Sequence, residues 1–98
     1  MLHIINKSPL DRPTLQTVER MALSGAVLLI EDGVYAATAG NVGESIVRRL
    51  MSRVKVYALM PDVEARGMAD RLIDGVTGVD YGGFVDLVAE HPNNQTWL

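Results

Sequence analysis

The chain has 98 residues, 48% of them hydrophobic, and a formal net charge of −3 at pH 7. The length predicts one domain over residues 1–98, and the acidic balance argues against direct nucleic-acid binding, which usually needs a basic surface. The absence of cysteine excludes disulfides, thiolate metal sites and a cysteine nucleophile. No apolar run approaches the roughly 20 residues of a membrane span, and the first residues lack the charged region of a signal peptide. We therefore expect a cytoplasmic protein without a membrane partner.

The first elements are a buried strand and a helix. Residues 2–5 are apolar and are followed by polar residues, which predicts a short strand. Residues 8–11 (SPLD) are typical of a helix start, with serine as the cap and proline in the first turn. Pro13 can delay this start. The buried face of the helix is predicted from apolar residues at helical spacing, namely Leu15, Val18, Met21 and Ala22.

The most informative stretch is residues 27–37 (VLLIEDGVYAA). Its four leading apolar residues do not alternate with polar ones, as in a strand that is covered on both faces of a parallel sheet. Asp32 and Gly33 then signal a sharp turn that launches a helix, because glycine accepts a positive φ. The carboxyl ends of parallel strands carry the working surface of open α/β sheets, so this turn is a candidate site.

The rest of the chain repeats the alternation of strands and helices. Further strands are expected over residues 54–59, 76–81 and 95–98, and further helical segments over residues 44–51, 62–65, 68–73 and 84–91. In the last helix the apolar spacing i, i+3, i+4 and i+7 is set by Phe84, Leu87, Val88 and His91. The fold class is therefore α/β, a single small domain with a four- to five-stranded, mainly parallel sheet and helices on both faces.

Three carboxylates follow two of the predicted strands. Glu31, Asp32 and Asp62 would lie near one another at the sheet edge, where they could bind a small ligand or Mg²⁺ or act in acid/base chemistry. The alternative, which we favour, is that Glu31 is solvated and Asp32 caps the next helix. The only local basic cluster, made of Arg48, Arg49, Arg53 and Lys55, is expected to solvate a helix end rather than bind phosphate.

Two other residues have open roles. Arg66 follows Asp62 by four residues, so the two side chains can form an ion pair within the turn. Alternatively, Arg66 binds a partner carboxylate or backbone. Trp97 either anchors an interface or covers the last helix. The high apolar content favours a subunit interface somewhere on so short a chain, the alternative being a well-covered monomer core.

In their order and spacing, several segments together resemble the DsrH/TusB family over essentially the whole chain. They are Asn6–Pro9 (NKSP), Leu29–Ala37 (LIEDGVYAA), Lys55–Leu59 (KVYAL) with Asp62 and Ala65–Gly67 (ARG), Asp80–Tyr81 with Phe84–Val85, and Trp97–Leu98. The resemblance implies a DsrE-like fold and a heterohexamer with two copies each of three related subunits, the partners being DsrE/TusD-like and DsrF/TusC-like. It also implies persulfide relay, either for 2-thiolation of the tRNA wobble uridine or for dissimilatory sulfur oxidation. The sequence leaves this choice open.

The chain departs from some family members at one position. The resemblance places the relay cysteine on the DsrE/TusD partner, and a further cysteine of some members falls near Val18 here. Valine cannot form a persulfide, so the chain is not expected to be an enzyme by itself, and we predict no catalytic, cofactor-binding or metal-binding residue. The alternatives are a stand-alone ligand or metal binder and a homo-oligomer, which can also form when the chain is isolated. The candidates for subunit contact or for fixing the fold are Asp32, Gly33, Tyr35, Asp62, Arg66, Gly67 and Trp97.

Overall fold

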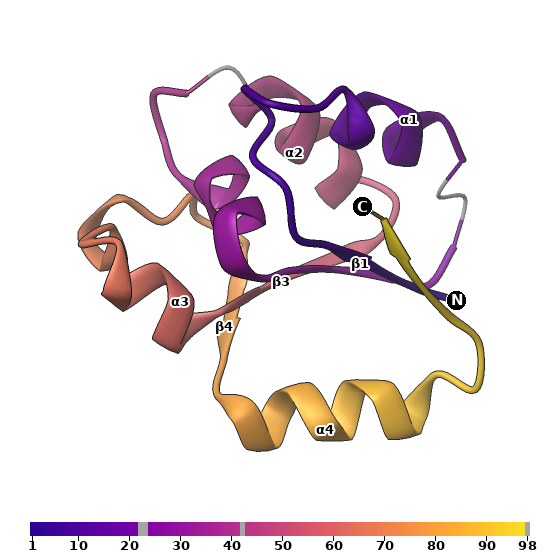
Figure 1. Ribbon diagram of the computed structural model, residues 1–98. Coiled ribbons are helices and arrows are strands. Elements are labelled where there is room, and N and C mark those ends of the chain that lie inside the picture. The colour runs from indigo at the N-terminus through magenta and orange to yellow at the C-terminus, as the bar shows by residue number, and fades with distance from the viewer. Residues whose placement is uncertain (22–23, 42, 98) are drawn as a thin grey trace.

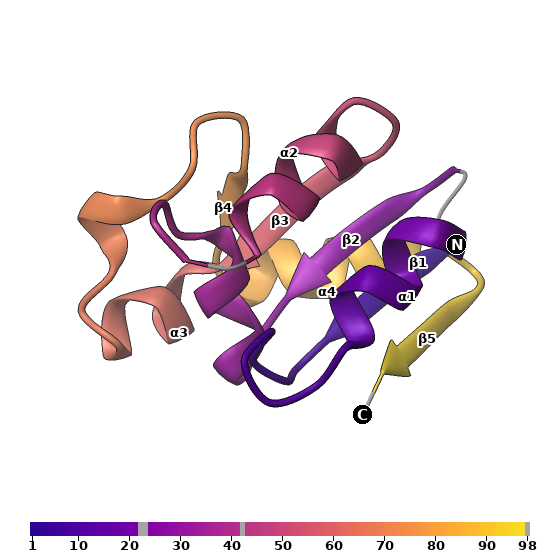
Figure 2. The ribbon, with the colours of Figure 1, turned by 90° about the horizontal axis from the view of Figure 1, so that it is seen from above.

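The fold is built on one five-stranded parallel sheet. The computed structural model describes residues 1–21, 24–41 and 43–97. The strands lie in the order β4-β3-β2-β1-β5, and Figure 2 shows them from above. Their bounds are β1 (Leu2–Ile5), β2 (Ala26–Leu29), β3 (Lys55–Leu59), β4 (Thr77–Val79) and β5 (Asn94–Trp97). The predicted α/β class and the parallel sheet are confirmed.

The helices cover the two faces of the sheet unequally. Their bounds are α1 (Thr14–Met21), α2 (Glu44–Met51), α3 (Met60–Ala65) and α4 (Tyr81–Glu90), with the 3-10 helices η1 (Glu31–Ala37) and η2 (Ala69–Arg71). In Figure 1, α1 and α2 lie above the sheet and α4 lies alone below it. No helix in the described part of the chain is long and apolar enough to cross a membrane.

The core follows this unequal arrangement. The larger apolar cluster lies between the sheet and the helices above it, and joins Val27 and Leu29 of β2 to Val18 of α1 and Leu50 of α2. The smaller cluster lies on the α4 face, where Leu87 packs against apolar residues of β1 and β2. All four residues of β2 are buried, which confirms that this strand is covered on both faces.

Several predicted helix starts differ from the structure. The first helix begins at Thr14 rather than at Ser8, because residues 8–12 form a turn in which the Leu10 N–H donates to Ser8 Oγ at 3.1 Å. Pro13 delays the helix as expected, and its carbonyl accepts the Thr17 N–H. The helix that the turn after β2 was expected to launch is present as the 3-10 helix η1. By contrast, α3 begins at Met60 rather than at Asp62, and α4 begins at Tyr81 rather than at Phe84. Of the predicted buried face, Leu15 and Val18 are buried, whereas Met21 at the helix end is 60% exposed. Ala22 lies outside the described residues.

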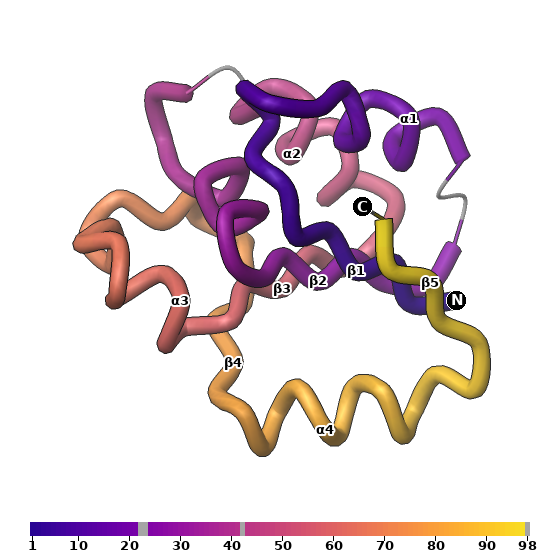
Figure 3. Tube along the Cα trace, in the orientation of Figure 1, coloured from indigo at the N-terminus to yellow at the C-terminus, as the bar shows by residue number. Residues whose placement is uncertain are grey.

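The chain end returns to the sheet as an edge strand. Figure 3 shows the tube running back from α4 to lie beside β1. β5 pairs in parallel with β1, and Ile5 lies opposite Trp97 in the register. The prediction of an edge strand in the tail is thus confirmed, although it begins at Asn94 and Leu98 lies outside the described residues.

Candidate functional site

The candidate site lies at the carboxyl ends of β2 and β3, where η1 meets α3. Glu31 follows β2 closely and has φ 49°, in the left-handed region that residues other than glycine seldom adopt. Its backbone N–H donates to Asp62 Oδ2 at 2.6 Å. Asp62 therefore satisfies, from another helix, one of the N–H groups that the start of η1 leaves without an intrahelical partner.

Arg66 at the end of α3 joins the two helices. Its Nε and Nη2 donate to Asp32 Oδ1 at 3.1 and 2.8 Å, and its Nη1 donates to the backbone carbonyl of Asp62 at 3.1 Å. The guanidinium carbon lies 6.0 Å from the centroid of the Tyr35 ring. The hydrogen bond to Asp32 raises the pKa of Arg66 above its ordinary value. We call Glu31, Asp32, Tyr35, Asp62 and Arg66 the strand-end cluster.

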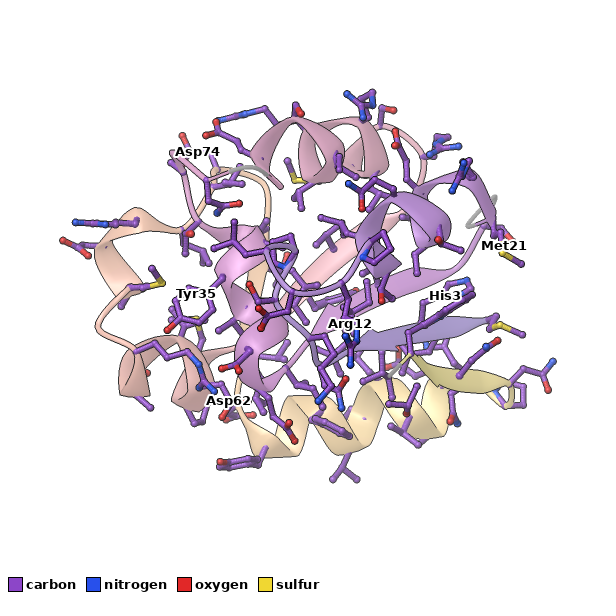
Figure 4. All side chains as sticks on the ribbon, turned by 45° about the horizontal axis from the view of Figure 1, so that its top comes forward. His3, Arg12, Met21, Tyr35, Asp62 and Asp74 are labelled. Atoms are coloured by element: carbon purple, nitrogen blue, oxygen red, sulfur yellow. The ribbon has the colours of Figure 1, made fainter. Side chains whose placement is uncertain are left out.

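The strand-end cluster is partly open to solvent. The Arg66 side chain is 23% exposed, whereas that of Asp32 is 55% exposed. Both donated bonds reach Oδ1 of Asp32, so among the described residues no hydrogen bond occupies Oδ2. Figure 4 shows Tyr35 and Asp62 on the same side of the molecule, away from Met21. The cluster thus presents a fixed acidic group with one oxygen available for a further donor.

Two predicted side-chain roles are wrong. Arg66 pairs with the carboxylate of Asp32 and only with the backbone of Asp62, so the Asp62–Arg66 ion pair, one of the two roles left open for Arg66, is absent from the described residues. Asp32 does not cap the following helix, because the side chain that binds the Glu31 N–H belongs to Asp62. Glu31 is exposed, as expected for a solvated side chain.

Gly33 is required for a different reason from the one predicted. Gly33 does not have a positive φ; the residue of this turn with a left-handed backbone is Glu31. A Cβ at Gly33 would lie 2.2 Å from the carbonyl oxygen of Ile5 in β1. That oxygen accepts the Ile30 N–H at 3.0 Å, so the turn presses directly onto the neighbouring strand. Glycine is needed here for close backbone approach.

Gly67 closes α3 with a glycine C-cap. It has φ 67°, and its N–H donates to the carbonyl of Glu64. The N–H of Met68 donates to the carbonyl of Val63, which completes a Schellman motif. This C-cap fixes the chain direction directly after Arg66 and so helps to hold its side chain towards η1.

Trp97 lies apart from the strand-end cluster. It belongs to β5, and β1 separates it from β2 in the sheet. Its indole Nε1 donates to His3 Nδ1 at 3.2 Å, and the two ring centroids are 6.1 Å apart. Burial is the main cause that lowers the pKa of His3 below 6.5, with a smaller effect from the charge of the Met1 amino group. The half-buried Trp97 therefore packs within this fold against β1 rather than over the last helix.

The sequence of the chain matches one family model. The family is described as "DsrH like protein", and the match covers residues 7–94. The chain belongs to the DsrH family. Protein TusB of Pectobacterium parmentieri is 44% identical over 98 residues, which is 99% of this chain and 100% of that protein. Protein TusB of Escherichia coli K12 is 33% identical over 97 residues, again 99% of this chain and all of that protein.

Solved structures show the same fold. The ychN protein of E. coli superposes with a TM-score of 0.84 at 18% identity and covers 98% of this chain and 97% of its own. MTH1491 of Methanobacterium thermoautotrophicum, titled a protein of unknown function, gives a TM-score of 0.80 at 20% identity, with coverage of 98% and 96%. At these identities the likeness shows the fold alone. Family membership supports the coarse interpretation that this DsrH-family chain is a sulfur-relay subunit.

The DsrH-family chain uses its candidate carboxylates internally. Asp32 binds Arg66 and Asp62 binds the Glu31 N–H, so these two are not arranged towards a common centre. The described residues contain no group of three or more histidine, cysteine, aspartate or glutamate side chains that could hold a metal ion. The geometry therefore does not favour a metal or acid/base site at the Glu31, Asp32 and Asp62 face.

The predicted basic cluster is also bound internally. Arg49 donates from Nε and Nη2 to the two carboxylate oxygens of Glu19, at 2.6 and 3.1 Å, and this hydrogen bonding lowers the pKa of Glu19. Arg53 donates to the backbone carbonyl of Glu19, and Arg48 pairs with Glu44. The Arg49 and Arg53 contacts tie the C-terminal ends of α1 and α2 together, whereas the Arg48 pair lies within α2. The three arginines lie at a helix end, as expected.

Sequence reasoning missed Asn41, which organises the segment after η1. Its Nδ2 donates to the carbonyls of Tyr35 and Thr38, and its Oδ1 accepts the Gly43 N–H at 2.6 Å. This last bond is an Asx turn, for which the spacing of Asn41 and Gly43 is a usable signal. Asn41 thereby holds the backbone carbonyl of Tyr35, the residue whose ring lies beside Arg66.

Proposed function

We propose that this DsrH-family chain is a non-catalytic assembly subunit of a sulfur-relay complex. Its partners are DsrE/TusD-like and DsrF/TusC-like subunits, arranged as a heterohexamer. The observation that carries this proposal is the coincidence of a family match over residues 7–94, with a relative matched over its whole length, and a complete lack of cysteine. A persulfide requires a cysteine sulfur, so any sulfur that the complex relays must be held by a partner.

The strand-end cluster supports such a role because it is rigid and polar without a nucleophile. Arg66 is held by two groups on two helices, and Asp32 keeps one oxygen for a further donor. A preorganised carboxylate of this kind suits an arginine or a backbone N–H on a sister subunit. We infer that the cluster positions a partner subunit rather than a substrate.

Of the two branches, we propose 2-thiolation of the tRNA wobble uridine. The relatives at 44% and 33% identity, matched over their full length, are named TusB, and the Tus branch of the resemblance leads to tRNA. The test is complementation of a tusB deletion, with 2-thiouridine in bulk tRNA measured by mass spectrometry. Restored thiolation is the expected result, and complementation only of a sulfur-oxidation defect would refute the choice of branch.

The subunit role is tested by co-expressing Arg66→Ala with the two partner chains. We expect a lower yield of hexamer and less sulfur transfer, because Asp32 then lacks the group that orients it. Arg71→Ala is the matched control, since Arg71 is an exposed arginine on η2 outside the strand-end cluster. Circular dichroism of each isolated chain reports whether the variant still folds.

The outcomes separate two conclusions. A folded Arg66→Ala chain with unchanged hexamer yield and sulfur transfer would remove Arg66 from the interface. A wild-type chain that never co-purifies with the partner chains would refute the subunit role itself.

A further inference from the structure

Helix α4 carries an apolar stripe that nothing in the described chain covers. Tyr81 and Val85 are 63% and 65% exposed, although both are large and apolar. Their spacing to Phe84 and Val88 is i, i+3, i+4 and i+7, so the four side chains follow one another along one side of the helix. Phe84 and Val88 are half-buried at the border with the sheet.

The exposed apolar stripe is separate from the side of α4 that packs on the sheet. Packing on the sheet uses Leu87, which is 5% exposed and is the single buried residue of the helix. A helix with apolar residues on most of its sides is normally covered on most of its sides. Here the sheet covers one side only, as Figure 1 shows for α4 below the strands. A contiguous exposed apolar patch of this kind marks an interaction surface.

The charges beside the stripe indicate what kind of surface fits. Asp86 and Glu90 are exposed and four residues apart, and like charges at this spacing destabilise a helix. Glu90 also lies in the last turn, where the helix dipole disfavours an acid and where α4 has no basic residue. The ion pairs among the described residues involve neither side chain. Both unfavourable features would be relieved by cations on a partner.

Gly82 gives a second, independent indication. By helical spacing it lies between the apolar stripe and the acidic pair. A Cβ there would meet only Asp80 Oδ1, at 3.4 Å, which is an ordinary contact, and its φ is not positive. The fold of the isolated chain therefore does not require glycine at this position, although glycine weakens a helix. The absent side chain allows another protein surface to approach the helix backbone closely.

We propose that the outer face of α4, formed by Tyr81, Val85, Gly82 and Asp86, is the docking surface for a partner subunit that presents an apolar patch rimmed by lysine or arginine. This inference rests on the proposed subunit role and adds to it a second contact surface, separate from the strand-end cluster. Charge complementarity selects this occupant. An acidic face repels anionic lipid, whereas a lysine or arginine rim on a partner would pair with Asp86 and Glu90.

The test is co-expression of Val85→Glu with DsrE- and DsrF-like subunits, followed by affinity capture through a tagged partner. We expect the amount of this chain captured with the tagged partner to fall by at least about tenfold, as for loss of an apolar contact at the centre of an interface. Met21→Glu is the matched control, because Met21 is a methionine 60% exposed at the end of α1. Both changes affect exposed residues, so circular dichroism should show a folded chain in each case.

Two further variants distinguish docking from general damage. Gly82→Ala should raise the unfolding midpoint of the isolated chain and yet weaken capture, which no stability defect can produce. The Asp86→Lys and Glu90→Lys double variant should weaken capture and remove its sensitivity to salt.

The results that overturn the inference are distinct from those that refute the subunit role. Capture of Val85→Glu at the wild-type level overturns it, provided that the wild-type chain is itself captured. Loss of self-association in Val85→Glu with an intact hetero-complex would also overturn it, and would assign the face to a second copy of the chain. If even the wild-type chain is not captured, it is the subunit role that fails.

Discussion

Replacing Gly33 with alanine is the sharpest test of how the turn after β2 is built. The added Cβ would lie 2.2 Å from the carbonyl oxygen and 2.9 Å from the carbonyl carbon of Ile5. Both are backbone atoms of a buried strand, so the clash cannot be relieved by turning a flexible side chain. Either β1 or the turn must shift, and the hydrogen bond from Ile30 N–H to Ile5 is then weakened.

The expected loss follows from these two effects. Overpacking a close-packed interior costs about 1–3 kcal/mol, and weakening a buried hydrogen bond costs about 1 kcal/mol more. A loss of about 2–4 kcal/mol is a large part of the roughly 5–15 kcal/mol that stabilises a domain. Because each kcal/mol lowers the Tm of a chain this short by roughly 4–8 °C, Gly33→Ala should melt at least about 8 °C below wild type.

The assay is urea unfolding followed by far-UV circular dichroism, together with a thermal melt. Gly40→Ala is the matched control, since a Cβ there meets nothing within 4 Å and only its φ of 90° opposes the change. The control should lose about 1 kcal/mol from the strained φ alone. The close-approach explanation is refuted if the free energy of unfolding of Gly33→Ala lies within about 0.5 kcal/mol of the wild-type value. It is also refuted if Gly33→Ala loses less stability than Gly40→Ala.

Two further predictions test contacts that join distant segments. Asp62→Ala removes the side chain that binds the Glu31 N–H, and should lower the free energy of unfolding by about 1 kcal/mol, as for loss of an N-cap. The control Glu64→Ala changes an exposed acid on the same helix and should have little effect. Equal stabilities of the two variants would contradict the capping role. His3 has a lowered pKa in the folded chain, so protonation favours the unfolded chain. The contribution of neutral His3 to the free energy of unfolding is therefore fully present above pH 6.5 and is lost as the pH falls below that value. Fluorescence of Trp97, the single tryptophan, should report this in urea titrations at pH 7.5 and 5.5, and His3→Leu should flatten the difference.

The apolar runs were sufficient to predict the strands. β1 and α2 have the predicted bounds, and β2, β3 and β5 each differ by only a residue at one or both ends. For β1 and β2 this is because a strand buried on both faces has no polar residues that obscure its ends. The order β4-β3-β2-β1-β5, by contrast, needs the path of α4 across the far face, which no local pattern contains.

The strand-end residues were found, but their partners were not. Asp62 and Arg66 are four residues apart, which favours a pair on a long helix. However, α3 ends at Ala65 and Arg66 is its C-cap, so the two side chains do not continue one helical face. The actual bonds, Glu31 to Asp62 and Arg66 to Asp32, span 31 and 34 residues. Such contacts are fixed by the meeting of two strand ends and not by spacing along the chain.

The position of β5 has a consequence for the order of folding. Of the five strands described, β1 is synthesised first and β5 last, yet the two are neighbours in the sheet. Until residues 94–97 are available, one edge of β1 keeps its backbone N–H and C=O groups without a strand partner, a state that invites pairing with another chain. Closing a loop across nearly the entire sequence is slow compared with forming local contacts. The packing of Trp97 beside His3 should therefore be the final step of folding, and its rate can be measured from the change in Trp97 fluorescence during refolding.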